Sequence, residues 1–331
     1  MLELPVSSRR PLHFSLLLAV AASSLVLAAC GDKAVTSPAN SSKPAAASPA
    51  QKGPSNRDTK AADPGQQMAS KLNAYTDVYN NLIGTFGLSE TRESYFDKNI
   101  IKRNASDSLS ITDGWLEGPL ESLKKARALP SGGNDVLEAP ADALIAALDK
   151  LVTQLKDLKV YYASKAYKND NLSRGKAEDP VLRANFEATT AALKTFNSAL
   201  GVEQKKSDAQ LLAKLKASGN LVAYNTKLAI GQGEELVSLF GGTADIKNAA
   251  KYVQGDALVA ELEKTLAQQR EQFAAAKGKE TQPDSGHEST ASNLVSLVGA
   301  YRDMKQSRKA EDFNGMVKEY NRAVESANRI R

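Results

Sequence analysis

The apolar and polar positions of this chain follow a helical period from about residue 66 to the C-terminus. The clearest stretch is a set of apolar residues that step alternately by four and three, namely Leu144, Leu148, Leu151, Leu155, Leu158 and Tyr162. This spacing places a single apolar stripe along one side of an α-helix. The pattern predicts a long amphipathic helix over residues 141–168, about 40 Å from end to end.

Two other stretches carry helix-start signals. Asp179 and Pro180 have the order of an N-cap and a first helical residue, since the side chain of Asp accepts from free backbone N–H groups and Pro needs no N–H partner there. Ser207 and Gln210 have the spacing of a capping box. Each pair predicts the start of a new helix.

The C-terminal third predicts further helices. One face carries Leu258, Leu262, Leu266, Gln269 and Phe273. Residues 281–289 interrupt the pattern, and a last helix is expected from about Ser292. No segment alternates with period two between hairpin turns. The sequence therefore predicts an all-α fold, an elongated antiparallel helical bundle with coiled-coil-like packing over residues 66–331.

A Tyr-Asn pair recurs in three of the predicted helices, as Tyr79-Asn80, Tyr224-Asn225 and Tyr320-Asn321. Asn also recurs at a spacing of seven, which returns to nearly the same helix face. Asn is a mediocre helix former, whereas a buried Asn at a helix seam fixes the register. We predict that the first, middle and last helices pack together through these stripes. A solvated asparagine face and a ligand-binding groove are the alternatives.

The first 29 residues have the organisation of an export signal, with Arg9 and Arg10 before an apolar run and small residues at its end. The run is shorter than the roughly 20 residues that a membrane-spanning helix needs. Leu27, Ala28, Ala29 and Cys30 resemble the lipobox of bacterial lipoprotein signals. Cys30 is the only cysteine of the chain, and the resemblance implies that it becomes the lipidated first residue. An ordinary secretory signal with a chance cysteine is the alternative.

The arginine pair leaves the export route open, because Ser8, Arg9, Arg10 and Leu12 partly match a twin-arginine signal. After Cys30, residues 30–65 are rich in Ala, Pro and Ser and contain no Leu or aromatic residue. Such a stretch buries too little to fold and is expected to be a flexible linker with a reach of about 30 Å.

The anchor suggests a location. Acyl chains on Cys30 would hold the chain on a membrane without spanning it. Gly31 stands where an Asp marks inner-membrane retention in enterobacteria-like sorting, so the resemblance favours the outer membrane. We expect a lipid-anchored protein of the bacterial cell envelope that faces the periplasm.

Charge limits the range of partners. The formal net charge is +5, and acidic and basic residues are interspersed along the predicted helices. This distribution is typical of a solvated surface and not of a nucleic-acid footprint. We expect the membrane as a partner through the N-terminal lipid, an envelope protein or peptidoglycan as a second partner, and no nucleic acid.

The residue inventory excludes most catalytic sets. His13 is lost with the signal, which leaves His287 in a loop flanked by Gly and Ser, where a surface position is expected. One histidine supports neither a His-based zinc cluster nor a Ser-His-Asp triad elsewhere in the chain. We predict no catalytic residues, no metal and no cofactor.

Paired carboxylates remain as candidates for acid–base chemistry. Glu234 with Glu235, and Glu117 with Glu121, are close in sequence on predicted helices. Helical proteins contain many such pairs, so the signal is weak. A hydrolase would need one carboxyl group with a raised pKa in a cleft.

Three stretches carry a family resemblance: "KLNAYTDVYNNLI", "VYYASKAYKNDNLSRGKAEDPVLRANFEA" and "MVKEYNRAVESAN". They resemble the YiiG-like family of bacterial lipoproteins, whose domain has no assigned function. The residues that match are Tyr161, Tyr162, Lys165, Tyr167, Asp170, Gly175, Lys176 and Pro180. Asn169, Asn171 and Glu178 depart from the family pattern. The resemblance implies a helical lipoprotein domain and supplies no catalytic residue.

The central stretch predicts a helix end, a basic loop and a new helix. A basic aromatic patch for an anionic ligand is one interpretation, formed by Tyr161, Tyr162, Lys165, Tyr167, Lys168, Arg174 and Lys176. The alternative is a solvated connector whose tyrosines pack back on the bundle. For the whole chain, the sequence predicts a non-catalytic scaffold or interaction protein. The alternative is a binding module, or less favourably a hydrolase, for envelope glycan or another anionic ligand.

Overall fold

The computed structural model describes residues 64–277 and 282–330, and every regular element in these residues is a helix. The predicted export signal, Cys30 and nearly all of the linker lie outside the described residues. In chain order the helices are α1 (Pro64–Ile83), α2 (Leu88–Phe96), α3 (Glu117–Arg127), α4 (Glu138–Ala163), α5 (Ser173–Ala217), α6 (Leu221–Ser238), α7 (Thr243–Lys247), α8 (Ala249–Ala276), α9 (Gly286–Ser307) and α10 (Ala310–Ala327), with short 3₁₀ turns η1 (Ile100–Lys102) and η2 (Ala166–Lys168). The predicted all-α fold class is confirmed.

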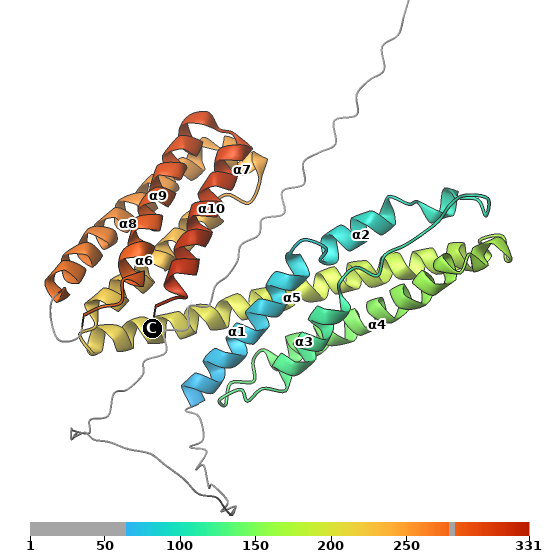
Figure 1. Cartoon of the computed structure of the whole chain (residues 1–331), viewed down its shortest axis with the longest axis horizontal. Coiled ribbons are helices and arrows are strands. Elements are labelled where there is room, and N and C mark those ends of the chain that lie inside the picture. The colour runs from blue at the N-terminus through green and yellow to red at the C-terminus, as the bar shows by residue number, and fades with distance from the viewer. Residues whose placement is uncertain (1–63, 278–281, 331) are drawn as a thin grey trace, which may run out of the picture.

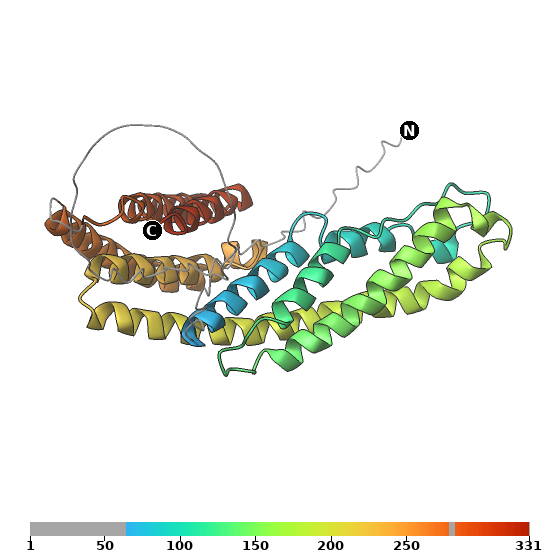
Figure 2. The same cartoon turned by 60° about the horizontal axis from the view of Figure 1, so that its bottom comes forward.

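The helices form two groups along an elongated molecule, α1–α5 at one end and α6–α10 at the other (Figure 1, Figure 2). The buried apolar residues correspondingly divide into two clusters. We call the cluster from residues 72–200 the first core and the cluster from residues 229–330 the second core. Helix α5 has 45 residues, about 68 Å, and runs from the first group to the second (Figure 1).

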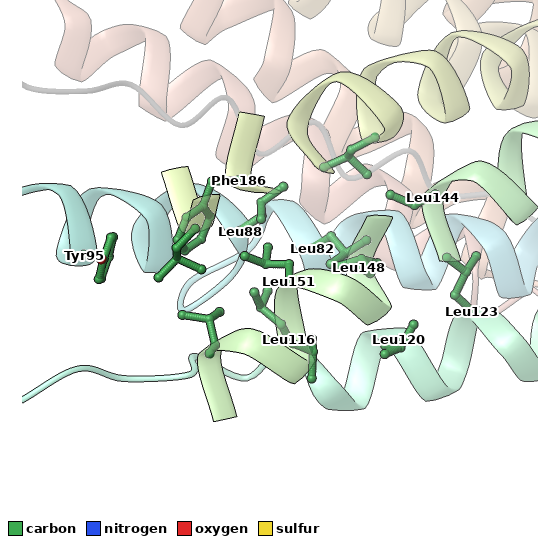
Figure 3. Packing of buried hydrophobic residues seen from close by; sticks show 14 of the residues in the cluster. Leu82, Leu88, Tyr95, Leu116, Leu120, Leu123, Leu144, Leu148, Leu151 and Phe186 are labelled. Carbon is green, nitrogen blue, oxygen red and sulfur yellow. The ribbon is translucent and has the colours of Figure 1, made fainter. Parts of the chain in front are cut away.

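The leucine stripe of α4 is the centre of the first core. All six predicted positions are buried, and several of them lie against residues of α1, α2 and α3 in Figure 3. Helix α4 ends at Ala163, earlier than the predicted residue 168. The reason is Lys165, which adopts a left-handed conformation with φ 59° and begins the separate turn η2.

The predicted helix starts at Asp179 and Ser207 are wrong, because both residues lie inside α5. The side chain of Asp179 does not cap a helix. It is 2% exposed, accepts a hydrogen bond from the Tyr95 hydroxyl at 2.9 Å and pairs with Arg183 at 2.8 Å. Because the Asp179 carboxylate makes these tertiary contacts, it does not accept from backbone N–H groups as the predicted N-cap would. Pro180 is tolerated as an internal residue of α5.

A cluster of ion pairs joins α1, α3 and α4 at the end of the first group. The Lys71 ammonium is 2.5 Å from Glu138 and donates to the carbonyl oxygens of Arg127 and Leu129 at 3.0 and 2.7 Å. Glu138 also pairs with the Arg127 guanidinium. The side chain of Lys71 is 4% exposed, so this cluster stabilises the packing of the three helices from within the core.

The second core is built by α6, α8, α9 and α10. The predicted helix around residues 258–273 is confirmed as part of α8. The expected last helix begins earlier, at Gly286, because the Asp284 carboxylate accepts the Gly286 N–H at 2.7 Å and the Asp284 carbonyl accepts the His287 N–H. It is also not the last, since Arg308 takes a left-handed conformation and α10 follows.

The predicted packing of the three Tyr-Asn helices is wrong for the first of them. Helix α1 packs against α2, α3 and α5, and its buried residues belong to the first core. Helices α6 and α10 do pack against each other in the second core. The local Tyr-Asn pattern is the same in both groups, but the path of α5 separates the first helix from the other two.

Candidate functional site

The predicted patch lies at the turn between α4 and α5. Besides Lys165, both Asn171 and Leu172 have positive φ angles, 56° and 63°. The Leu172 N–H donates to the Tyr167 carbonyl at 2.8 Å. Bulky residues in left-handed conformations persist only where their surroundings hold them, so this turn has a defined shape.

The three tyrosines of the predicted patch are buried in the first core, with exposed fractions of 4% for Tyr161 and 1% each for Tyr162 and Tyr167. Their ring centroids lie between 5.0 and 6.3 Å apart, which is the range of favourable aromatic contacts. The Tyr167 hydroxyl donates to the Asp107 carbonyl at 3.1 Å and accepts from the Leu109 N–H. The rings therefore pack back on the bundle and are not offered to a ligand.

Asp170 stabilises the turn through hydrogen bonds to its carboxylate. Its carboxylate accepts the Tyr161 hydroxyl at 2.8 Å and the backbone N–H groups of Leu172 and Arg174. Burial alone would raise the pKa of Asp170, but these hydrogen bonds lower it below its ordinary value. For Tyr161, burial and then the hydrogen bond to Asp170 raise the pKa to about 12.

The four cations of the patch divide into two kinds. Arg174 lies over the Tyr161 ring, 5.1 Å from its centroid, and pairs with Asp157 and Glu178. Lys165 and Lys168 are exposed, Lys176 is half-buried, and none of these three forms an ion pair with any residue of the described ranges. The surface of the turn thus offers lysine ammonium groups without aromatic rings.

Sequence reasoning missed a second set of cations at the same end of the first group. The loop after α2 and the turn between α4 and α5 lie together there in both views (Figure 1, Figure 2), and the hydrogen bond from Tyr167 to Asp107 joins them. This loop contains Lys98, Lys102 and Arg103, and the Arg103 Nε donates to the Lys98 carbonyl at 2.9 Å. No local pattern links these residues to the lysines some 65 positions later, because only tertiary packing brings the two segments together.

Trp115 was also not singled out by the sequence. It lies in the loop before α3 and is 76% exposed, between buried Ile111 and Leu116. The residues on either side form ion pairs with α4: Asp113 with Lys159 at 3.0 Å, and Glu117 with Lys156 at 2.5 Å. The indole therefore stands on a loop fixed at both ends.

His287 is not a surface residue, which corrects the expectation from its Gly and Ser neighbours. It lies in the first turn of α9 and is 6% exposed, with Nδ1 3.0 Å from Thr226 Oγ1. Thr226 gives its own hydroxyl hydrogen to the Val222 carbonyl, so the imidazole hydrogen is on Nδ1. Burial lowers the pKa of His287 below its ordinary value, against the opposing charge of Asp284.

Of the predicted carboxylate pairs, Glu117 is bound to Lys156 and Glu121 to Lys124. Glu234 is half-buried whereas Glu235 is exposed, so the two side chains do not share one environment. Burial raises the pKa of Glu234, and the charge of Asp208 raises it further. The candidate acid in the second group is therefore Glu234 with Asp208 as its charged neighbour.

Within the ranges that the structure describes, no group of three or more His, Cys, Asp or Glu residues is arranged to hold a metal ion. In the same ranges, no helix combines the length and the apolar character that a membrane span requires.

The arrangement defines a class, an elongated helical protein with two cores joined by one long helix. The family model for a protein of unknown function (DUF3829) matches residues 66–328. Because this match covers well over half of the chain, the chain belongs to that family. No curated protein and no solved structure matches it.

Proposed function

We propose that this chain is a lipid-anchored protein of the bacterial cell envelope that works by binding other envelope components. One observation carries the proposal: the single cysteine, Cys30, follows Leu27, Ala28 and Ala29 at the end of an apolar run. The resemblance to YiiG-like lipoproteins supports it. The outer membrane, on its periplasmic face, is the proposed location.

The helical body suits an interaction role. An elongated surface along α4 and α5 gives a partner many places to dock. Exposed ion pairs such as Arg92 with Glu187 and Arg302 with Glu263 run along the sides. Pairs of this kind contribute little stability and keep a surface soluble.

Hydrolysis of envelope glycan is the second candidate, and Glu234 alone favours it. A general acid needs a raised pKa at neutral pH, which burial supplies here. Release of soluble fragments from purified cell walls by the native protein, and its loss in Glu234→Gln, would establish this activity. We propose the non-catalytic role because the neighbouring acid, Asp208, is held by Lys227 at 2.7 Å and would not act freely as a nucleophile or base.

The decisive experiment is mass spectrometry of the N-terminus together with membrane fractionation. We expect the mature chain to begin at Cys30 with acyl groups attached, and Cys30→Ser to lose both the acyl groups and the processing at that residue. Ser37→Ala in the linker is a matched control and should be processed normally. A secreted chain with an unmodified thiol at residue 30 would overturn the proposal.

A further inference from the structure

Trp115 is the only tryptophan of the chain and the most exposed large apolar residue in the described ranges. Single exposed apolar side chains are common and need no explanation by themselves. Here the loop that carries the ring is closely packed next to it. Gly114 has φ +61°, and a Cβ at this position would overlap the hydroxyl oxygen of Thr91. Thr112 Oγ1 accepts the Gly114 N–H at 3.0 Å.

The surface beside Trp115 continues along α4. Val160 follows Lys159 directly and lies one helical turn after Lys156, the two lysines that hold the loop. Val160 is 67% exposed. Exposed apolar side chains thus lie beside ion-paired donors and acceptors on this part of the surface.

Beyond Val160 the surface becomes cationic. Five basic residues gather in two segments at this end of the first group and have no ion pair with any residue in the described ranges. Along the sides of the group many basic residues are paired, and the unpaired lysines, such as Lys125, Lys150 and Lys194, are spread over three helices. We call these five the basic tip: Lys98, Lys102, Arg103, Lys165 and Lys168. The C-termini of α2 at Phe96 and of α4 at Ala163 lie near these cations. Each helix C-terminus is equivalent to only about half a negative charge. The same two segments also contain Asp97, Asp107 and Asp170, so the five cations leave a small excess of positive charge at the basic tip.

We propose that Trp115 and the basic tip together bind an acidic glycan strand of the cell envelope. A sugar ring stacks its C–H face on the indole, and carboxylates of the peptides attached to the strand pair with the basic tip. The proposal rests on the envelope location proposed above and names the partner and the surface. It replaces the buried tyrosines of the predicted patch with an exposed ring from a different segment.

Two observations favour a glycan over a membrane surface. First, the ring is flanked by the ion pairs of Asp113 with Lys159 and of Glu117 with Lys156. Their oxygens can accept from sugar hydroxyls, whereas an indole inserted into a membrane would take these charged groups out of water at a cost. Second, the basic tip lies away from the attachment of the linker. Pro64, where α1 begins, lies against Gly132 in the loop before α4, and the tip lies beyond the other end of α4, about 39 Å away.

Fluorescence of Trp115 gives a direct test, since this residue is the sole source of tryptophan emission. The full processed protein in detergent micelles is titrated with soluble disaccharide-peptide fragments of peptidoglycan. We expect strong acrylamide quenching in the free protein and weaker quenching as the fragments bind. Added salt should weaken the binding, because charged contacts at the basic tip are screened over about 10 Å at 0.1 M.

Variants separate the two parts of the site. In co-sedimentation with purified cell walls, Trp115→Ala should weaken binding about tenfold, the upper range for loss of an aromatic contact. The combined change Lys102→Gln, Arg103→Gln, Lys165→Gln and Lys168→Gln should abolish the salt dependence and most of the binding. Val253→Ala and the pair Lys125→Gln with Lys150→Gln alter equally exposed residues elsewhere. These control variants should bind normally.

Two results would overturn the proposal. One is unchanged quenching of Trp115 at saturating fragment concentration. The other is quenching by brominated acyl chains when the protein is reconstituted in anionic phospholipid vesicles, which would place the ring in a membrane. Acylation of Cys30, measured on the same sample, reports separately on the proposed anchor. Absence of glycan binding by an acylated protein would therefore reject only the glycan site.

Discussion

The hydroxyl of Tyr95 donates to the carboxylate of Asp179 at 2.9 Å, and the two residues are 1% and 2% exposed. This contact joins α2 to α5, and Arg183 lies on the other oxygen of the carboxylate. Tyr95 also stacks on Phe186, with ring centroids 6.1 Å apart (Figure 3). A buried charge is thus held by a phenol and a guanidinium inside the first core.

Tyr95→Phe should destabilise the protein by about 1 to 3 kcal/mol, because the Asp179 carboxylate loses a buried donor. Tyr75→Phe is a matched control. Tyr75 is equally buried, but its hydroxyl has no hydrogen-bond partner in the described ranges, so the change should be neutral or stabilising. Urea unfolding followed by circular dichroism compares the two. Equal losses in both variants would show that the Tyr95 hydroxyl contributes nothing beyond its ring.

Each of the two helix groups contains one glycine that packs directly against a tyrosine hydroxyl. A Cβ added at Gly175 would be 2.5 Å from the Tyr162 oxygen, and one added at Gly255 would be 2.5 Å from the Tyr301 oxygen. Gly175→Ala and Gly255→Ala should each cost about 1 to 3 kcal/mol through overpacking. Gly118→Ala in α3 meets no atom within 4 Å and should instead stabilise by about 0.5 kcal/mol. Thermal unfolding of the three variants checks the order, and a destabilising Gly118→Ala would contradict it.

Lys71→Met should destabilise by about 3 kcal/mol, because it leaves Glu138 buried with one cation fewer. The double change Lys71→Met with Glu138→Leu removes both charges and should recover much of this loss. Denaturant unfolding of the single and double variants gives the coupling free energy. A double variant less stable than the single one would show that the pairing of Glu138 with Arg127, which then keeps Asp142 alone, dominates the cluster.

His287 should make stability depend on pH in the mildly acidic range. Burial lowers its folded pKa below the ordinary value of 6.5, although Asp284 opposes the shift. The unfolded chain therefore takes up a proton at a higher pH than the folded protein. Stability is full above about pH 6.5, falls below it and levels off beneath the folded pKa.

The measurement is urea unfolding at about pH 7.5 and about pH 5.5 for the native chain and His287→Gln. We expect the native chain to lose stability between the two values, and the variant to lose less. An identical loss in both would assign the effect to carboxylates. One such carboxylate is Asp256, whose pKa the Lys305 ammonium holds below its ordinary value against the effect of burial. Its protonation therefore reduces the stability only at a lower pH than that of His287.

Much of the local structure follows from sequence period alone. The α4 stripe is buried at every predicted position, because a repeat of three and four residues leaves a helix only one apolar face. The end of α4 was placed too late because no local signal marks Lys165 as left-handed. The caps assigned to Asp179 and Ser207 failed because a helix of 45 residues is stabilised by packing against two groups, which outweighs signals worth about 1 kcal/mol each.

By itself, the sequence determined that the described chain is helical, which faces of its helices are apolar, and that its one cysteine follows a lipobox-like stretch. The tertiary structure decided the division into two cores, the burial of Tyr161, Tyr162 and Tyr167, and the meeting of the basic residues near 100 with those near 165. The physical reason is the distance along the chain over which each kind of interaction acts. Helix formation depends on neighbours within a turn or two, whereas burial and charge clustering depend on which distant segments the long helix α5 holds together.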